Sequence, residues 1–442
     1  MQLPPLDPDT LFEDLLQDLP PETLEMAHEF KAFSRARKIK TPQQLLRAVL
    51  LYGGLDQSLR EVAGNMTLLV QQITDSSIAE RLVACRPWVK ALLPKMLGHG
   101  ALTTLPHNRR FIVIDGSTVQ SPGAKRIHYR LHIGIELVTL AFTKVMVSTG
   151  KTGESLRHFA LSAGDVAIVD RGYCHPQAVV DTRAAQADVI VRLNPHNMPL
   201  YQDDGVPVDL VAALKDQAPT TIHTLSAWVG PASQRVQGWV HAYRLSQEQA
   251  NKARSECRKR NSKKGKTPKE STLFLAGYVL VWTSLPPEVL SADTIMTLYR
   301  LRWQVEVAIK RWKSLLDVDA LRARYGSPLA GLWLHGKLLY ALLVERRMRR
   351  LLGDDWGRLD RERTATWWRP WKLLHQSLVP RLTGALSWPE QRWELSLEVL
   401  AERPRKRKLQ RLPEELLGRS QSGVDTVPTP PGDEVWEEPI AA

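Results

Sequence analysis

The feature that most constrains the fold is a series of five short apolar stretches between residues 111 and 194. They are FIVIDGSTV, IHYRLHIGIEL, TLAFTKVMVS, AIVDRGY and DVIVRLN, which begin at residues 111, 127, 139, 167 and 188. Their length and their content of β-branched residues predict strands. Between the last two, HPQAVVDTRAAQ (175–186) has the pattern of a helix. Three neighbouring strands followed by alternating strand and helix predict a mixed α/β sheet with helices packed on it.

The first 100 residues have a helical pattern. In TPQQLLRAVLLYGG, Thr41 is a candidate N-cap with Pro42 in the first turn, and Gly53 and Gly54 end the segment. Two further short helices are expected in DQSLREVAGNM (56–66) and DSSIAERL (75–82). Such a series is compatible with a helix-turn-helix DNA-binding domain and equally with a small helical bundle that does not contact DNA.

The remaining chain divides by composition into five further regions. We expect a first part of the α/β core at 101–194, a β-rich insertion with a basic loop at 195–271, a second core part at 272–325, a helical region at 326–412 and an acidic disordered tail at 413–442. The basic stretch 252–269 holds nine Lys or Arg and one Glu, which is typical of a solvated loop or of a segment that follows a phosphate backbone. Tryptophans in the helical region are expected to be core or interface anchors, and a basic cluster follows at 403–411.

The charge of the chain favours a polyanionic partner. The formal net charge is +13, and because residues 413–442 carry seven acidic residues and one Arg, the rest of the chain carries +19. Neutralising phosphates releases condensed counterions, so such an excess raises the expectation of nucleic-acid binding. The three cysteines, Cys85, Cys174 and Cys257, are widely spaced and predict neither a disulfide framework nor a zinc site. No signal peptide or membrane-spanning segment is expected, which points to a soluble cytoplasmic protein with no membrane partner.

Two aspartates stand at the ends of predicted strands. Asp115 is followed directly by Gly116, and Asp170 is followed one residue later by Gly172. In an open α/β sheet, ligands are held at strand ends, although either aspartate alone could also cap a helix or satisfy a turn.

A third carboxylate lies in the stretch LYRLRWQVEVAIKRWKSLL, residues 298–316, which has the apolar period of one helix. At about 100° per residue, Glu306 shares a narrow stripe with Tyr299, Arg302 and Lys313, while the apolar side chains form a separate face. Three carboxylates without a His or Cys partner suit Mg²⁺ or Mn²⁺ better than zinc. Two such ions can activate an attacking hydroxyl and stabilise the leaving oxygen of a phosphodiester.

These residues resemble a known family. The pattern Y-x2-R-x3-E-x6-K at Tyr299, Arg302, Glu306 and Lys313 is similar to the YREK signature of bacterial DDE transposases of the insertion-sequence-four group. IDGSTV and VDRGY resemble the first and second Asp blocks of that family, and the similarity extends over about residues 40–345.

The resemblance implies an RNase H-like catalytic domain, interrupted by a β-rich insertion, in which Asp115, Asp170 and Glu306 bind two Mg²⁺ or Mn²⁺ ions. It also implies that Tyr299, Arg302 and Lys313 contact phosphates of the element's ends. Trp303 resembles an aromatic that stacks on a displaced base in some relatives, although core packing is the stronger interpretation. Further candidates for DNA binding are Arg171 beside the second aspartate and, in the basic stretch, Arg258, Lys259, Arg260, Lys263 and Lys264.

The function implied is a DNA transposase that cleaves at insertion-sequence ends and transfers the strand into target DNA. Its partners would be double-stranded DNA, as terminal inverted repeats and as target, and a second copy of the chain on paired ends. Two other classes stay open from the residues alone: a non-catalytic DNA-binding protein derived from a transposase, and a metal-dependent nuclease without strand transfer.

Overall fold

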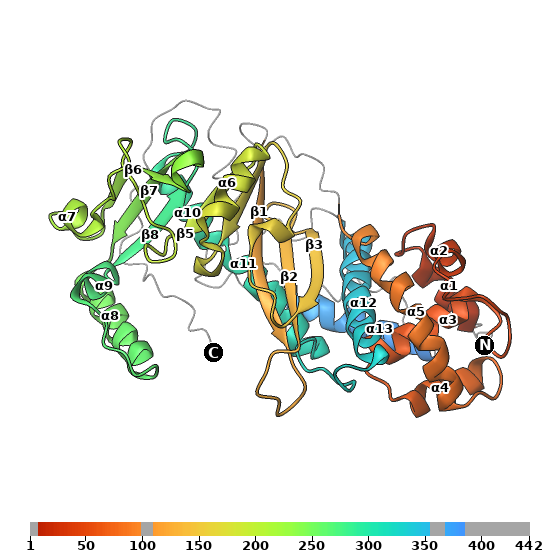
Figure 1. Ribbon diagram of the computed structural model, residues 1–442. Helices are drawn as coiled ribbons and strands as arrows, with labels where there is room; N and C mark the ends of the chain where they lie inside the picture. Colours follow the sequence, from red (N-terminus) through yellow and green to blue (C-terminus); the bar gives the residue numbers. More distant parts are fainter. Residues whose placement is uncertain (1–7, 99–108, 354–366, 385–442) are drawn as a thin grey trace. The chain divides into compact units, whose positions relative to one another are not determined.

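The computed structural model describes residues 8–98, 109–353 and 367–384, which group into two compact units (Figure 1). The described part of unit 1 comprises residues 8–98, 115–153, 304–353 and 367–384. That of unit 2 comprises residues 109–114 and 154–303. The border between the units runs through strand β1 (Arg110–Val119) and passes again between Trp303 and Gln304.

Unit 1 is mainly helical. Besides the second half of β1, its elements are α1 (Pro8–Leu16), α2 (Thr23–Glu29), α3 (Pro42–Val49), the π-helical turn η1 (Leu50–Gly54), α4 (Leu59–Leu69), α5 (Asp75–Lys95), β2 (Tyr129–Glu136), β3 (Phe142–Thr149), α11 (Trp303–Leu316, entering from Gln304), α12 (Pro328–Leu352) and α13 (Trp368–Thr383).

Unit 2 holds most of the strands. Besides the first half of β1, its elements are η3 (Leu156–His158), β4 (Asp165–Val169), η4 (Arg171–Tyr173), α6 (Pro176–Ala184), β5 (Asp188–Arg192), α7 (Leu210–Leu214), β6 (Ile222–Val229), η5 (Ala232–Gln234), β7 (Val236–Arg244), α8 (Gln247–Ser262), α9 (Glu270–Leu275), β8 (Tyr278–Thr283) and α10 (Ala292–Leu301).

The eight strands follow the order β3-β2-β1-β4-β5-β8-β7-β6 in one mixed sheet. Strands β1, β4 and β5 run parallel, whereas β2 and β3 pair antiparallel, as do β5, β8, β7 and β6 in turn. The mixed α/β fold predicted from the sequence is therefore confirmed, and it is consistent with the RNase H-like fold. The insertion does contribute strands, but β6 and β7 continue the sheet from β8 instead of forming a separate one.

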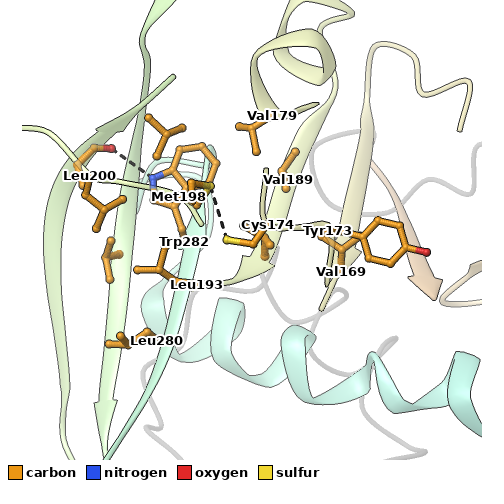
Figure 2. Packing of buried hydrophobic residues seen from close by; sticks show 14 of the residues in the cluster. Val169, Tyr173, Cys174, Val179, Val189, Leu193, Met198, Leu200, Leu280 and Trp282 are labelled. Atoms are coloured by element: carbon orange, nitrogen blue, oxygen red, sulfur yellow. Dashed lines mark hydrogen bonds between the residues drawn. The ribbon is translucent and has the colours of Figure 1, made fainter. Parts of the chain in front are cut away.

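The core of unit 2 explains why its central strands are apolar throughout. Every residue of β4 and β8 is buried, as expected for strands covered on both faces. Figure 2 shows side chains from β4, β5 and β8 packed together, with Trp282 of β8 near Met198. Buried Cys174 lies 3.8 Å from the Met198 sulfur, and burial raises the pKa of its thiol to about 11. This cysteine is therefore a neutral core residue at physiological pH.

The helix after Thr41 begins at its predicted N-cap, whereas α4 begins at Leu59, three residues later than predicted, because Ser58 forms a capping box with Glu61. The Thr41 side chain accepts a hydrogen bond from the Gln44 backbone N–H at 3.2 Å, with Pro42 at the first helical position. Helical structure continues through η1 to Gly54, and a Cβ added to Gly53 would lie 2.9 Å from the Gly336 backbone of α12. We predicted a short helix from Asp75, but the helix that starts there is 21 residues long. A role of these helices in DNA binding stays a prediction.

The basic stretch is the clearest departure from prediction. Residues expected as a solvated loop belong mostly to α8, which begins with a capping box formed by Ser246 and Gln249. Ala250 and Cys257 are its buried residues, and Figure 1 shows α8 projecting away from strands β6–β8. The physical reason is that the capping signal outweighs charge repulsion in a helix that remains solvated on most of its surface.

The C-terminal region is helical where it is described. α12 and α13 form there, and Trp371 of α13 is fully buried, which confirms the core role predicted for this tryptophan. The predicted basic cluster at 403–411 and the predicted acidic tail at 413–442 lie outside the described residues.

Candidate active site

One predicted aspartate lies within a strand, and the other directly follows the neighbouring parallel strand. β1 and β4 pair in parallel, and their register ends with Ile114 opposite Val169. Asp115 is the next residue of β1, which continues to Val119, whereas Asp170 directly follows the end of β4, so the strand end predicted at Asp115 is wrong. Both aspartates are half-buried, and a carboxylate oxygen of Asp115 accepts the N–H of Gly116 at 2.8 Å. The paired stretch of the two strands therefore ends directly before both aspartates, although β1 itself continues past Asp115.

Asp170 lies next to an aromatic residue of the predicted signature. The Tyr299 hydroxyl donates a hydrogen bond to Oδ1 of Asp170 at 3.4 Å. Tyr299 is only 7% exposed, and burial raises the pKa of its phenol, so that it stays protonated and able to donate. The guanidinium groups of Arg302 and Arg192 lie 5.9 and 6.0 Å from the centre of the Tyr299 ring. Unit 2 thus gathers one carboxylate, one phenol and two cations.

Arg192 and Glu154 were not singled out in the sequence. Arg192 ends β5, the strand beside β4, so the strand-end argument applied to β5 would have identified it. Glu154 lies against the loop after Asp170, because a Cβ added to Gly172 would be 2.1 Å from a Glu154 carboxylate oxygen. A larger residue at position 172 would displace this flexible carboxylate, and no local sequence pattern indicates that Glu154 packs there.

Glu306 lies on α11, and the side of this helix away from Glu306 faces a buried polar network. It is half-buried and shares a helix face with Lys313, seven residues on, whose Nζ lies 3.7 Å from Asp319. Arg311 and Trp312 project about 140° and about 120° away on opposite sides of that face, at 3.6 residues per turn. These two residues anchor the side of α11 that lies away from Glu306.

The network converges on one carboxylate oxygen of Glu345 in α12. Arg311 donates to it at 2.6 Å, Trp312 at 3.4 Å and Trp371 of α13 at 3.0 Å. The side chains of Arg311 and Glu345 are only 7% and 5% exposed. The Trp312 ring also stacks on Phe142 of β3, with ring centres 4.4 Å apart. Helices α12 and α13 and strand β3 of unit 1 thus fix the rotation of α11 about its axis.

The signature residues do not lie on one continuous helix, which corrects our prediction. α10 ends at Leu301, the Arg302 N–H bonds the Tyr299 carbonyl three residues back, and α11 begins at Trp303. The stripe argument holds only for Glu306 and Lys313. The apolar period continues through the break, so periodicity alone could not detect it.

The other predicted DNA-binding residues differ in exposure. Arg258, Lys259 and Arg260 of α8 are exposed, as are Lys263 and Lys264 just beyond it, whereas Arg171 is half-buried. Trp303 is also half-buried, and its indole nitrogen is buried without a hydrogen bond.

Within residues 8–98, 109–353 and 367–384, no three His, Cys, Asp or Glu side chains gather closely enough to hold a metal ion. Metal binding by Asp115, Asp170 and Glu306 therefore stays a prediction. In the same described ranges, no helix is both long and apolar enough to cross a bilayer.

Comparison with known proteins identifies the family. Residues 106–342 match the family described as "Transposase DDE domain". The chain is 32% identical, over 334 residues that cover 74% of it and 90% of the relative, to the putative transposase InsL for insertion sequence element IS186A of Escherichia coli (strain K12). It is equally identical, over 335 residues and the same shares, to the transposase for insertion sequence element IS421 of Escherichia coli.

More distant similarities point the same way. The transposase for insertion sequence element IS231F of Bacillus thuringiensis subsp. israelensis is 27% identical over 273 residues, 56% of each chain. A cryo-EM structure of piggyBac transposase in a synaptic complex with hairpin DNA aligns over 91% of this chain and 86% of that one, at 9% identity and a TM-score of 0.43. That likeness is too weak to support a conclusion. The family match and the relatives at 32% identity confirm the resemblance read from the sequence, and the chain belongs to the DDE transposase family.

Proposed function

We propose that this DNA transposase uses Asp115, Asp170 and Glu306 to bind two Mg²⁺ or Mn²⁺ ions, cleaves DNA at the ends of its insertion sequence and transfers the freed strand into target DNA. The observation that carries the proposal is the parallel register of β1 and β4, which ends one residue before both aspartates. Glu306 is half-buried and lies on a helix that is anchored on its opposite side, which supports this residue as the third ligand. Three carboxylates form a hard-oxygen donor set that suits these ions.

The side chains around Asp170 support a separate role for each residue in the reaction. When bound, the ions would activate the attacking water or 3′-hydroxyl and stabilise the leaving oxygen. Tyr299 orients the Asp170 carboxylate through its hydroxyl, and Arg302 and Arg192 supply positive charge for the scissile phosphate. Lys313 would contact phosphate from the Glu306 face of α11.

The exposed cations of α8 and the residues after it provide a second DNA contact in this proposal. Arg258, Lys259, Arg260, Lys263 and Lys264 would bind phosphates without reading sequence. Arg171 is assigned to phosphate near Asp170, and Trp303 to the DNA beside Arg302. Two DNA ends must be brought together for transposition, so we propose a homodimer on paired ends.

The test is Mg²⁺-dependent cleavage and strand transfer on DNA that carries the terminal repeats of the element. We expect Asp115→Ala, Asp170→Ala and Glu306→Ala each to lower cleavage by at least about 10³-fold, because each removes a ligand of the ions that carry the chemistry. The matched control is Asp204→Ala, an exposed carboxylate in a turn of unit 2.

Unchanged cleavage in Glu306→Ala would refute the assignment of that residue. End binding without any cleavage by the wild-type chain would favour a non-catalytic binder. Cleavage without joining would favour a nuclease.

A further inference from the structure

Three loops of unit 1 join into one surface beyond the strand ends. Residues 120–128 connect β1 to β2, residues 149–153 follow β3, and residues 320–326 precede α12; together we call them the loop platform. Gln120 bridges Ala320 in parallel, with its N–H bonded to the Asp319 carbonyl at 3.0 Å and its carbonyl to the Leu321 N–H at 2.9 Å. The Gly150 N–H bonds the His128 carbonyl at 2.9 Å. These main-chain bonds hold the three loops together.

The loop platform is entirely basic in its charged residues. It contains Lys125, Arg126, Lys151, Arg322 and Arg324, all exposed, and no Asp or Glu. Arg322 is paired with Asp317 at 3.0 Å. The other four form no ion pair with any residue that the structure describes. Four such cations on linked loops create a local positive potential that attracts phosphate.

An aromatic pair lies among these cations. The rings of His128 and Tyr325 stack with centres 4.1 Å apart and planes within 9°, and the Tyr129 ring meets Tyr325 edge-on at 5.6 Å. The Ser121 N–H donates to Nδ1 of His128 at 3.2 Å, which fixes the imidazole beneath Tyr325. Tyr325 is nevertheless 49% exposed. A single exposed aromatic is ordinary, but one held rigidly by stacking and surrounded by cations is the combination found in sites for single-stranded nucleic acid.

We infer that the loop platform binds an unpaired stretch of DNA, with a base stacked on Tyr325 and the backbone phosphates on Lys125, Arg126, Lys151 and Arg324. An unpaired base is favoured because bases inside a duplex have both faces covered by their neighbours, whereas an unpaired base can stack on the exposed Tyr325 ring. The inference rests on the proposed function, since cleavage at DNA ends is what would expose unpaired nucleotides to this surface.

The test compares two DNA probes with the full-length chain in EDTA, so that no cleavage occurs. One probe is a duplex with a single-stranded overhang that carries 2-aminopurine, whose fluorescence falls when it stacks on an aromatic ring; the other is the same duplex without the overhang. We expect the wild-type chain to bind the overhang probe more tightly and to quench its fluorescence. Tyr325→Ala should abolish the quenching and weaken overhang binding by about tenfold, while blunt-duplex binding changes less than about twofold.

Control variants separate stacking from folding and from charge. Tyr325→Phe keeps the ring and should behave as wild type. Val206→Ala removes another half-exposed apolar side chain, which lies in unit 2 beside Asp203 and Asp204, and should leave the binding of both probes unchanged. Lys125→Gln combined with Arg126→Gln should weaken overhang binding and reduce its salt dependence.

The outcomes distinguish this inference from the proposed function. Equal quenching and equal overhang binding by Tyr325→Ala and wild type would overturn the inference alone, provided that the wild-type chain binds DNA and cleaves it in Mg²⁺. A wild-type chain that binds neither probe and cleaves no end DNA would overturn both.

Discussion

Asp170 and Glu306 are positioned by opposite means. Asp170 follows a five-residue strand whose residues are all buried, and one phenol hydroxyl reaches its carboxylate. Glu306 lies on a helix whose far side is tied to a buried carboxylate by one guanidinium and one indole, with a second indole from α13 completing the network. One carboxylate is located by apolar burial and register, and the other by a buried polar network.

This difference has consequences for how each carboxylate tolerates change. A strand within an apolar core keeps its position when one hydrogen bond is lost, because many small packing contacts remain. A buried ion pair behaves differently, since removing one partner leaves the other charge desolvated and unpaired. We therefore expect Glu306 to depend strongly on its support and Asp170 only weakly.

The largest effect should come from removing the Glu345 carboxylate. Glu345→Ala leaves the Arg311 guanidinium buried without its partner, and should lower the free energy of unfolding by about 3–5 kcal/mol in chemical denaturation. Glu345→Gln keeps an acceptor for the two indoles and should lose less. At temperatures where Glu345→Gln remains folded, its cleavage should require a higher Mg²⁺ concentration than that of wild type, because α11 is free to rotate Glu306 out of place.

Glu80→Ala is the matched control, as Glu80 is an exposed carboxylate of α5 in the same unit. It should change the unfolding free energy by less than about 0.5 kcal/mol. If Glu345→Ala proved as stable as this control, the network would not be what holds α11.

A smaller effect is expected on the Asp170 side. Tyr299→Phe removes the long hydrogen bond of 3.4 Å to Asp170 together with the interaction of the hydroxyl with Arg302, so cleavage should slow by about fivefold, equivalent to about 1 kcal/mol. Tyr278→Phe is the control: it removes a shorter bond, 2.8 Å to the Leu214 carbonyl in the same unit, and should affect stability without changing the cleavage rate. A cleavage rate for Tyr299→Phe equal to that of wild type at saturating DNA would mean that the phenol does not orient Asp170.

The same contrast explains what could be predicted from the sequence. Asp115 and Asp170 could be proposed because an apolar strand pattern that leads into an aspartate is a local signal, visible in a few residues. The Glu345 network was missed because its carboxylate lies in an apolar helix, 34 residues from Arg311 and 26 from Trp371. Convergence of that kind depends on tertiary packing, which no short window of sequence contains.

Two local errors have equally physical causes. The break at Arg302 escaped detection because apolar residues continue at helical spacing on both sides of it. α8 was taken for a loop because its charge dominates its composition, although Ser246 and Gln249 carried a readable capping signal. In the first case the apolar period gave no sign of a break, and in the second the charge composition was weighed above the capping residues.

The central claim is that the carboxylates of Asp115 in β1, Asp170 after β4 and Glu306 in α11 bind the same divalent ions. Mn²⁺ binding to the full-length chain with end DNA, followed by electron paramagnetic resonance, tests it most directly. We predict that the wild-type complex binds two Mn²⁺ ions at this site and that Asp115→Ala, Asp170→Ala and Glu306→Ala each abolish or greatly weaken that binding, while Asp204→Ala does not. Undiminished Mn²⁺ binding in all three variants would contradict the account.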